Sequence, residues 1–141
     1  MNSDSINISV AKLIPQKAPF VMVDKIIQYS EHEVTSSLTI SEANIFTKNK
    51  EFTEPGLIEH MAQTVALHTG YKYHLLNKPS PTGYIGSIKA IEILNLPKLN
   101  DKLITKASIL HEILGFTLVT IDVMLNGVSI ATGEMKTVVA N

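Results

Sequence analysis

The residues best placed to do chemistry lie at the start of the clearest helical pattern in the chain. On a helix of about 100° per residue with Ile58 set at zero, Glu59 falls on the edge of the apolar stripe, beside the small side chains of Ala62 and Ala66. A half-buried carboxylate there would have space above it for a ligand, which suits acid–base work. Glu59 is therefore the candidate catalytic residue. The alternative is a solvated carboxylate that is favoured by the positive end of the helix dipole.

The neighbouring residues of this helix suggest support for Glu59 rather than a metal site. Gln63 lies one turn later and is in a position to hydrogen-bond to Glu59, although an exposed polar position is an equally good interpretation. His60 projects to the side opposite Ile58. Because His60 and His68 are poorly spaced to share a metal, and no third ligand has the right spacing, we predict no metal site. The sequence also contains no nucleophile elbow and no glycine-rich phosphate loop.

Composition narrows the classes of function. The 141 residues include 12 basic and 13 acidic side chains, for a net charge of -1, and every basic residue is a lysine. This balance, without a basic cluster, argues against a nucleic-acid partner. The absence of Cys excludes disulfides, thiolate nucleophiles and the usual structural zinc sites, although compositional drift of the source genome is a simple explanation of such absences.

The chain shows no targeting or membrane pattern. Its longest apolar runs fall short of the roughly 20 residues that a membrane helix needs, and its polar N-terminus has no signal-peptide pattern. We therefore expect no membrane association and a soluble, cytoplasmic protein, with a single domain spanning residues 1–141.

The elements that must position these residues follow the order of an α+β fold. We expect a short helix or turn over residues 8–14, strands near 20–27 and 34–40, a polar loop over 41–55 and a long helix from 56 to about 78. Four longer strands follow, over 83–95, 101–113, 116–125 and 128–139, the last two joined by Asn126 and Gly127, a strong hairpin signal. This order predicts a six-stranded antiparallel sheet. The helix is apolar on more than one side, which indicates an enclosing sheet or a partner, and hence an oligomer.

Two motifs together resemble those of the hotdog-fold 3-hydroxyacyl-[acyl carrier protein] dehydratases. IPQKAPFVMVD at residues 14–24 resembles the usual opening I-P-H-R-x-P-F-L-L-V-D, and EHMAQ at 59–63 resembles E-A-M-A-Q. YIGSIK at 84–89 resembles the start of the family's next strand, and the last three strands match in length and order. The resemblance covers nearly the whole chain. It implies a long helix wrapped by an antiparallel sheet, and two subunits that pair their sheets.

The resemblance also implies a reaction, namely loss of water from a 3-hydroxyacyl thioester on phosphopantetheine, in fatty acid or polyene biosynthesis and without a cofactor. In this family a His and an acidic residue from opposite subunits usually share the acid–base work, and Glu59 takes the acidic position. A backbone N–H near the helix start, from Gly56 or Leu57, would polarise the thioester carbonyl. Gln63 and Gly86 are further candidates for substrate binding.

The loop before the helix departs from the family pattern. The family places its His there, in G-H-F-P, but this chain has no His between His32 and His60, and its loop is shorter. It is closer to dehydratase-like proteins of aryl-polyene clusters, which also have a short loop before E-x-M-A-Q. Glu59 then acts alone or through water, with Asn49 as the nearest residue able to orient that water. Alternatively, the chain pairs with a complete dehydratase, or binds acyl thioesters without turning them over. A hotdog thioesterase is a further alternative, since fold does not fix function.

The implied partners are an acyl carrier protein with a phosphopantetheine-linked acyl chain, and a second hotdog subunit in a homodimer or heterodimer. Because the chain has no Arg, an acidic carrier and its phosphate would have to be met by lysines and backbone N–H groups. Lys72, Lys89 and Lys98 are the candidates.

Overall fold

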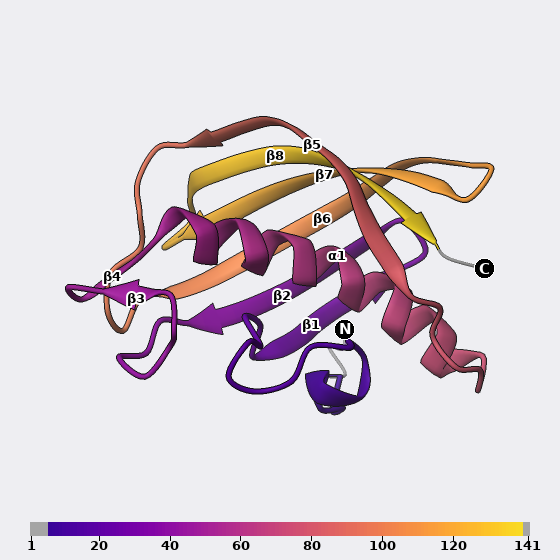
Figure 1. Cartoon of the computed structure of the whole chain (residues 1–141), viewed down its shortest axis with the longest axis horizontal. Coiled ribbons are helices and arrows are strands. Elements are labelled where there is room, and N and C mark those ends of the chain that lie inside the picture. The colour runs from indigo at the N-terminus through magenta and orange to yellow at the C-terminus, as the bar shows by residue number, and fades with distance from the viewer. Residues whose placement is uncertain (1–5, 140–141) are drawn as a thin grey trace.

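A computed structural model of the chain describes residues 6–139, which form one long helix against a six-stranded antiparallel sheet (Figure 1). The 3₁₀ turn η1 spans Val10–Lys12 and the helix α1 spans Glu54–Leu75. The sheet has the order β1-β2-β6-β7-β8-β5, which confirms the predicted architecture. A small hairpin, absent from the prediction, precedes the helix. The strands are β1 (Lys25–Ser30), β2 (Glu33–Thr39), β3 (Thr47–Lys48), β4 (Glu51–Phe52), β5 (Gly83–Ile93), β6 (Lys102–Ile113), β7 (Phe116–Leu125) and β8 (Val128–Val139).

Tight turns with left-handed backbone connect the longest strands. Asn126 and Gly127 have φ of 51° and 79° between β7 and β8, which confirms the predicted hairpin. Leu114 and Gly115, with φ of 51° and 82°, turn the chain between β6 and β7 in the same way. Leucine is rarely placed there because its Cβ crowds the left-handed backbone. Within residues 6–139, no helix is both long and apolar enough to span a membrane.

The first strand begins later than the sequence predicts. Residues 20–24 are not part of the sheet, and β1 starts at Lys25. Helix side chains bind this backbone instead: Gln63 donates to the Phe20 carbonyl (2.9 Å) and accepts from the Met22 N–H (2.7 Å). His60 Nδ1 lies 2.7 Å from the Met22 carbonyl. The predicted strand over 20–27 is therefore wrong in its first half, because α1 satisfies the backbone groups of Phe20 and Met22. Contact with β2 begins at Asp24, whose N–H donates to the Ser37 carbonyl at 2.7 Å.

The face of α1 that packs on the sheet is only partly the one predicted. Met61 and Val65 are buried as expected, but Ile58, Ala62 and Ala66 are only half-buried. The buried side of the helix also carries polar residues, and the sheet provides partners for them. The contacts are His60 to Thr105 (2.7 Å), Thr64 to Ser36 (2.7 Å) and His68 to the Ser30 carbonyl (3.0 Å). A hydrophobic pattern does not identify this face, because His and Thr side chains can be buried in the protein interior when they are hydrogen-bonded.

Candidate active site

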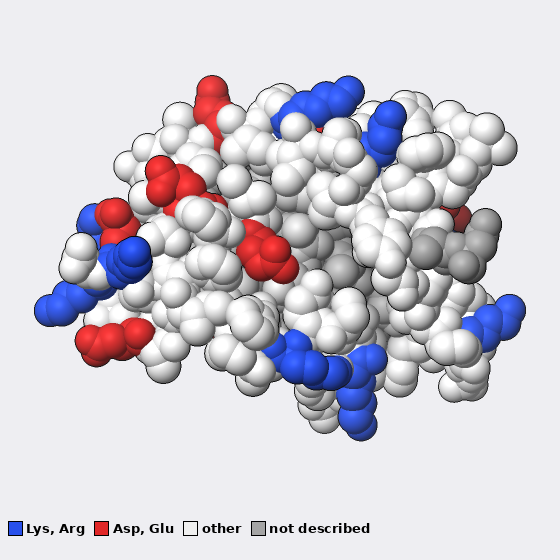
Figure 2. Space-filling view, viewed as in Figure 1, with Lys and Arg blue, Asp and Glu red and all other residues white. Residues whose placement is uncertain are grey.

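Glu59 lies at a cavity of about 170 Å³ between α1, the N-terminal segment and the start of β5. The small side chains of Ala62 and Ala66 line it together with Glu59, as the helical wheel predicts. In Figure 2, acidic side chains extend to the centre of this face, beside a hollow, whereas lysines lie mostly around its rim. The other lining residues come from α1 itself (Gln63, Val65 and Thr69), from the N-terminal segment, from residues 80–85 before and within β5, and from β7 and β8.

The N-terminal segment lies directly against the helix beside this cavity. A Cβ at Gly70 would overlap the Leu13 carbonyl oxygen, so glycine allows this close approach. Leu13, Pro15 and Gln16 then form one wall of the cavity. The motif at residues 14–24 thus builds part of the site with its first residues.

Gln63 holds the Glu59 carboxylate through a fully used amide group. Its Nε2 donates to Glu59 Oε2 at 2.7 Å and to the Phe20 carbonyl at 2.9 Å, while its Oε1 accepts from the Met22 N–H at 2.7 Å. Because the Met22 N–H is a donor, the oxygen of the amide must face it and the NH₂ must face Glu59. Gln63 is buried, so this arrangement fixes one carboxylate oxygen. Residues 6–139 offer Glu59 no lysine or histidine as an ion-pair partner.

His60 is next to Glu59 in sequence but is a structural residue on the buried side of α1. Its Nδ1 donates to the Met22 carbonyl, so its Nε2 must be the acceptor for the Thr105 hydroxyl, at 2.7 Å in each case. Burial lowers the pKa of His60 to about 4, although the hydrogen bond to Met22 opposes this shift. His60 is therefore neutral and fully paired, and it does not replace the histidine that the family pattern expects.

The two candidate backbone donors at the helix start differ in whether they are already paired. The Leu57 N–H is already bound to the Thr53 carbonyl at 3.0 Å. The Gly56 N–H has no acceptor within residues 6–139, as is usual in the first turn of a helix. A Cβ at Gly56 would lie 2.5 Å from Phe46 Cβ and 2.7 Å from the Phe52 ring, so packing also requires glycine here. Neither Gly56 nor Leu57 lines the Glu59 cavity.

Two further candidates, Asn49 and Gly86, also lie outside the cavity lining. Asn49 is exposed at the turn between β3 and β4, where its φ of 52° suits asparagine. Gly86 lies at a register shift between β5 and β8, where a Cβ would be 3.2 Å from Val138 Cγ2. The turn explains why asparagine occupies position 49, and the close packing explains why glycine occupies position 86. Neither explanation involves a ligand.

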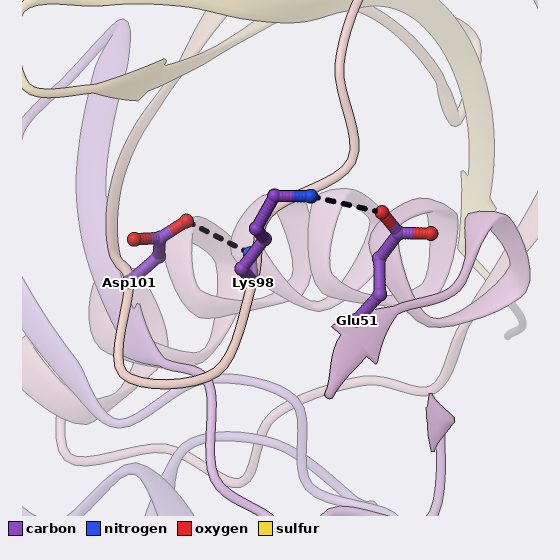
Figure 3. Close-up of polar contacts among 3 residues, drawn as sticks. All are labelled: Glu51, Lys98 and Asp101. Carbon is purple, nitrogen blue, oxygen red and sulfur yellow. Dashed lines mark hydrogen bonds and ion pairs between the residues drawn. The ribbon is translucent and has the colours of Figure 1, made fainter. Parts of the chain in front are cut away.

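The three candidate lysines occupy different surroundings. Lys98 Nζ pairs with Glu51 Oε2 at 3.4 Å, and its backbone N–H donates to Asp101 Oδ2 at 2.8 Å (Figure 3). The pair with Glu51 joins the loop after β5 to the β3–β4 hairpin, and the bond to Asp101 lies within that loop. Lys89 is exposed on β5, and Lys72 lines a second cavity beside α1. The described residues contain no group of three or more His, Cys, Asp or Glu side chains that could hold a metal ion.

Gln16 is a site residue that the sequence reasoning did not single out. Its side chain lines the Glu59 cavity, and its Oε1 is buried without a hydrogen-bond partner among the described residues. A buried amide oxygen without a donor is costly, so it is suited to accept a hydrogen bond from a ligand. Its place in the motif at residues 14–24, three residues before Pro19, was the available signal.

Comparison with known proteins identifies a matching family and a sequence relative at low identity. The profile of the ApeP-like family, described as ApeP dehydratase, matches residues 8–138. The 3-hydroxyacyl-[acyl-carrier-protein] dehydratase FabZ of Ruminiclostridium cellulolyticum is 26% identical over 136 residues, which cover 92% of this chain and 94% of that protein.

Solved structures show the same fold at low identity. A chain of the dehydratase heterocomplex ApeI:P from Xenorhabdus doucetiae superposes with a TM-score of 0.89 at 19% identity, covering 96% of this chain and 93% of that one. A hypothetical thioesterase protein with coenzyme A from Streptococcus pneumoniae TIGR4 superposes with a TM-score of 0.63 at 14% identity, covering 83% and 85%. The arrangement of helix and sheet is the hotdog fold.

Proposed function

This chain belongs to the ApeP-like dehydratase family, and we propose that it removes water from 3-hydroxyacyl thioesters carried on an acyl carrier protein. The observation that carries this proposal is the Glu59 carboxylate, which is half-buried at a cavity and held by Gln63 at 2.7 Å. The match to a carrier-protein dehydratase over most of the chain supports the same substrate class.

The reaction needs a second acid–base group besides Glu59. Loss of water removes a proton from C2 and protonates the hydroxyl that leaves C3, so a base and an acid share the work. We assign to Glu59 the role of the acid that protonates the leaving hydroxyl. No histidine within residues 6–139 lines the Glu59 cavity, and His60 is neutral with both ring nitrogens paired. The base must therefore come from outside this chain or from water.

We infer that a partner hotdog subunit supplies this base across the edge strand β5. Residues 83–85 of β5 line the Glu59 cavity, so a partner at this edge would reach the site. Tyr84, Ile85 and Ile88 are 60%, 40% and 45% exposed along it, which is an apolar surface on a strand that pairs with β8 on one side and with no strand of the described residues on the other. The related ApeI:P structure is a heterocomplex of dehydratases. A homodimer would bring together two chains that both lack the expected histidine, so a heterodimer is the proposed assembly.

The remaining candidate residues would contact the thioester and the phosphate of the carrier. Of the two candidates at the helix start, the Gly56 N–H is the proposed donor to a thioester carbonyl, since the Leu57 N–H is already paired, although Gly56 lies outside the lining of the Glu59 cavity. Lys72 and Lys89 are the proposed contacts for the phosphate of the carrier, because Lys98 is already paired with Glu51.

Turnover of a carrier-bound 3-hydroxyacyl thioester, with and without a co-expressed His-bearing hotdog subunit, tests this proposal. We expect enoyl thioester from the co-purified complex and little product from this chain alone. Full activity of this chain alone would contradict the shared site. Release of free acid and thiol, without enoyl product, would instead identify a thioesterase.

A further inference from the structure

The wall of the Glu59 cavity carries a polar group that the acid–base chemistry does not use. This group is the amide of Gln16, whose side chain is half-buried at the cavity and whose Oε1 is buried without a hydrogen-bond partner within residues 6–139. The other amide at the cavity, that of Gln63, is already bound to Glu59, Phe20 and Met22. Gln16 is thus the amide that remains to bind a ligand.

The segment that carries this amide is fixed against α1 on both sides of Gln16. Before it, the Leu13 carbonyl packs closely on Gly70. After it, the Phe20 carbonyl accepts a hydrogen bond from the Gln63 amide, which also holds the proposed catalytic carboxylate. Because both contacts are to the same helix, the Gln16 side chain and that carboxylate are held at the walls of one space.

The Glu59 cavity is small, so it takes only the reacting end of a substrate. Its volume of about 170 Å³ is below the roughly 300–1,000 Å³ of typical ligand pockets. In a 3-hydroxyacyl thioester, the donor nearest to the reacting carbons is the 3-hydroxyl, because the nearest amide N–H of the pantetheine arm lies beyond the sulfur and two methylene groups. The hydroxyl O–H is therefore the donor that reaches an acceptor in this cavity.

We propose that Gln16 Oε1 accepts a hydrogen bond from the 3-hydroxyl of the substrate, so that this protein recognises 3-hydroxyacyl thioesters by their hydroxyl group. The inference rests on the proposed function, because it places that hydroxyl at Glu59. A hydroxyl has one O–H donor and two acceptor lone pairs. Gln16 binds the hydrogen, which leaves a lone pair directed at the acid on Glu59. The terminal torsion of a glutamine is soft, so the amide oxygen can turn to the hydroxyl at little cost.

Gln16 moves no proton in this reaction. The base takes the proton from C2, the electron pair of that bond forms the C2–C3 double bond, and the C3–O bond breaks as Glu59 transfers its proton to the oxygen. The water that leaves carries the proton from Glu59 and the hydrogen that Gln16 binds. The enoyl product has no hydroxyl and leaves Gln16 Oε1 unpaired, so the site binds the product less tightly than the substrate.

The test compares the binding of two ligands that differ only in the hydroxyl, 3-hydroxybutyryl-pantetheine amide and butyryl-pantetheine amide. Titration calorimetry measures both Kd values on the complex with its partner subunit, after thermal unfolding shows that each variant is folded. We expect the wild type to bind the hydroxy ligand about tenfold or more tightly than the other. Gln16→Leu removes the acceptor, so the two Kd values should become equal through weaker binding of the hydroxy ligand alone.

Two further variants separate the acceptor from the shape of the cavity. Gln16→Glu keeps an oxygen acceptor on a side chain of the same shape, so it should retain the preference for the hydroxy ligand. Gln28→Leu is the matched control and should also retain it, because Gln28 is exposed on β1 and does not line the Glu59 cavity. Equal weakening of both ligands by Gln16→Leu would overturn the proposal, since Gln16 would then only shape the cavity.

These binding results do not depend on turnover. Loss of the preference in Gln16→Leu would support the contact with the hydroxyl even if Glu59→Gln retains turnover and the proposed function fails. An unchanged preference in Gln16→Leu would overturn the contact even if Glu59→Gln abolishes turnover.

Discussion

At the scale of single residues, the site depends on Gln63 as much as on Glu59. The amide of Gln63 makes three hydrogen bonds, of which one holds the carboxylate and two hold the backbone of residues 20–22. Gln63 is therefore a positioning residue. Its one amide ties the proposed catalytic carboxylate to the motif that forms the wall of the cavity.

Replacing Gln63 should separate positioning from folding. Gln63→Leu leaves the Met22 N–H and the Phe20 carbonyl unpaired, so we expect a loss of about 2 kcal/mol or more in the free energy of unfolding together with a lower kcat. Gln63→Glu keeps an acceptor for Met22 but donates nothing to Glu59, so kcat should fall with a smaller loss of stability. Urea denaturation and steady-state kinetics measure the two effects. An unchanged kcat in both variants would show that Gln63 does not position the carboxylate.

The unpaired amide of Gln16 makes a different prediction. Gln16→Leu removes a buried oxygen that has no donor, so the unliganded protein should gain up to about 1 kcal/mol of stability. If a ligand normally supplies that donor, KM for the carrier-bound substrate should rise at the same time. Thermal unfolding and kinetics of the same variant test both statements. A gain in stability with an unchanged KM would show that Gln16 does not bind the substrate.

Burial of His60 makes the stability of the protein depend on pH. Its pKa is about 4 in the folded chain and near 6.5 when unfolded, so the unfolded state binds a proton that the folded state excludes. The stability contributed by neutral His60 is complete above the unfolded pKa and is lost as pH falls from about 6.5 toward about 4. The loss amounts to at most about 3 kcal/mol.

Urea denaturation across this pH range measures the effect. His60→Asn keeps a donor for the Met22 carbonyl and does not titrate, so its stability should fall less steeply with pH than that of the wild type. His111→Asn, at an exposed position on β6, is the matched control and should retain the wild-type slope. If His60→Asn has the same slope as the wild type, burial of this imidazole does not govern the acid stability.

At the scale of elements, β5 combines a structural edge with a wall of the site. Because its exposed residues are apolar, a charged side chain introduced there should block assembly with a partner subunit. We expect Ile88→Lys to prevent co-purification with a hotdog partner and to remove turnover that depends on the partner. Val128→Lys is the control, because Val128 is 62% exposed at the start of β8, away from that edge. Retained assembly in Ile88→Lys would place the interface elsewhere.

The strands and the helix were predictable because their patterns are local. Alternation and the turn at Asn126 and Gly127 define the last strands without any tertiary information. The backbone of residues 20–22 was not predictable, because it is bound by Gln63 and His60 from about forty residues away. The prediction of the buried helix face was wrong for the same reason. Thr64 and His68 are buried because Ser36 and the Ser30 carbonyl of the sheet hydrogen-bond to them.

The position of Glu59 at the candidate site was predictable, whereas the contacts of the neighbouring residues were not. The wheel placed Glu59 beside Ala62 and Ala66, and the cavity lies there. The orientation of Gln63 and the unpaired oxygen of Gln16 depend on contacts between distant segments, which periodicity does not show.

At the scale of the whole molecule, the fold offers half of an acid–base pair and an open sheet edge beside it. The cavity at Glu59 includes residues 83–85 of β5, so assembly and catalysis are linked in one place. These features agree with the proposed function, in which this chain binds and protonates its substrate and a partner subunit supplies the base.

Acid–base catalysis by Glu59 is tested most directly by kcat for water loss from a 3-hydroxyacyl carrier protein. The measurement compares the complex of wild-type chain and partner with the same complex carrying Glu59→Gln, after thermal unfolding shows that both are folded. Glutamine has nearly the same shape but cannot transfer the proton, so we predict a kcat about 10²- to 10⁴-fold lower with little change in KM. Equal kcat values in the two complexes would contradict this role for Glu59.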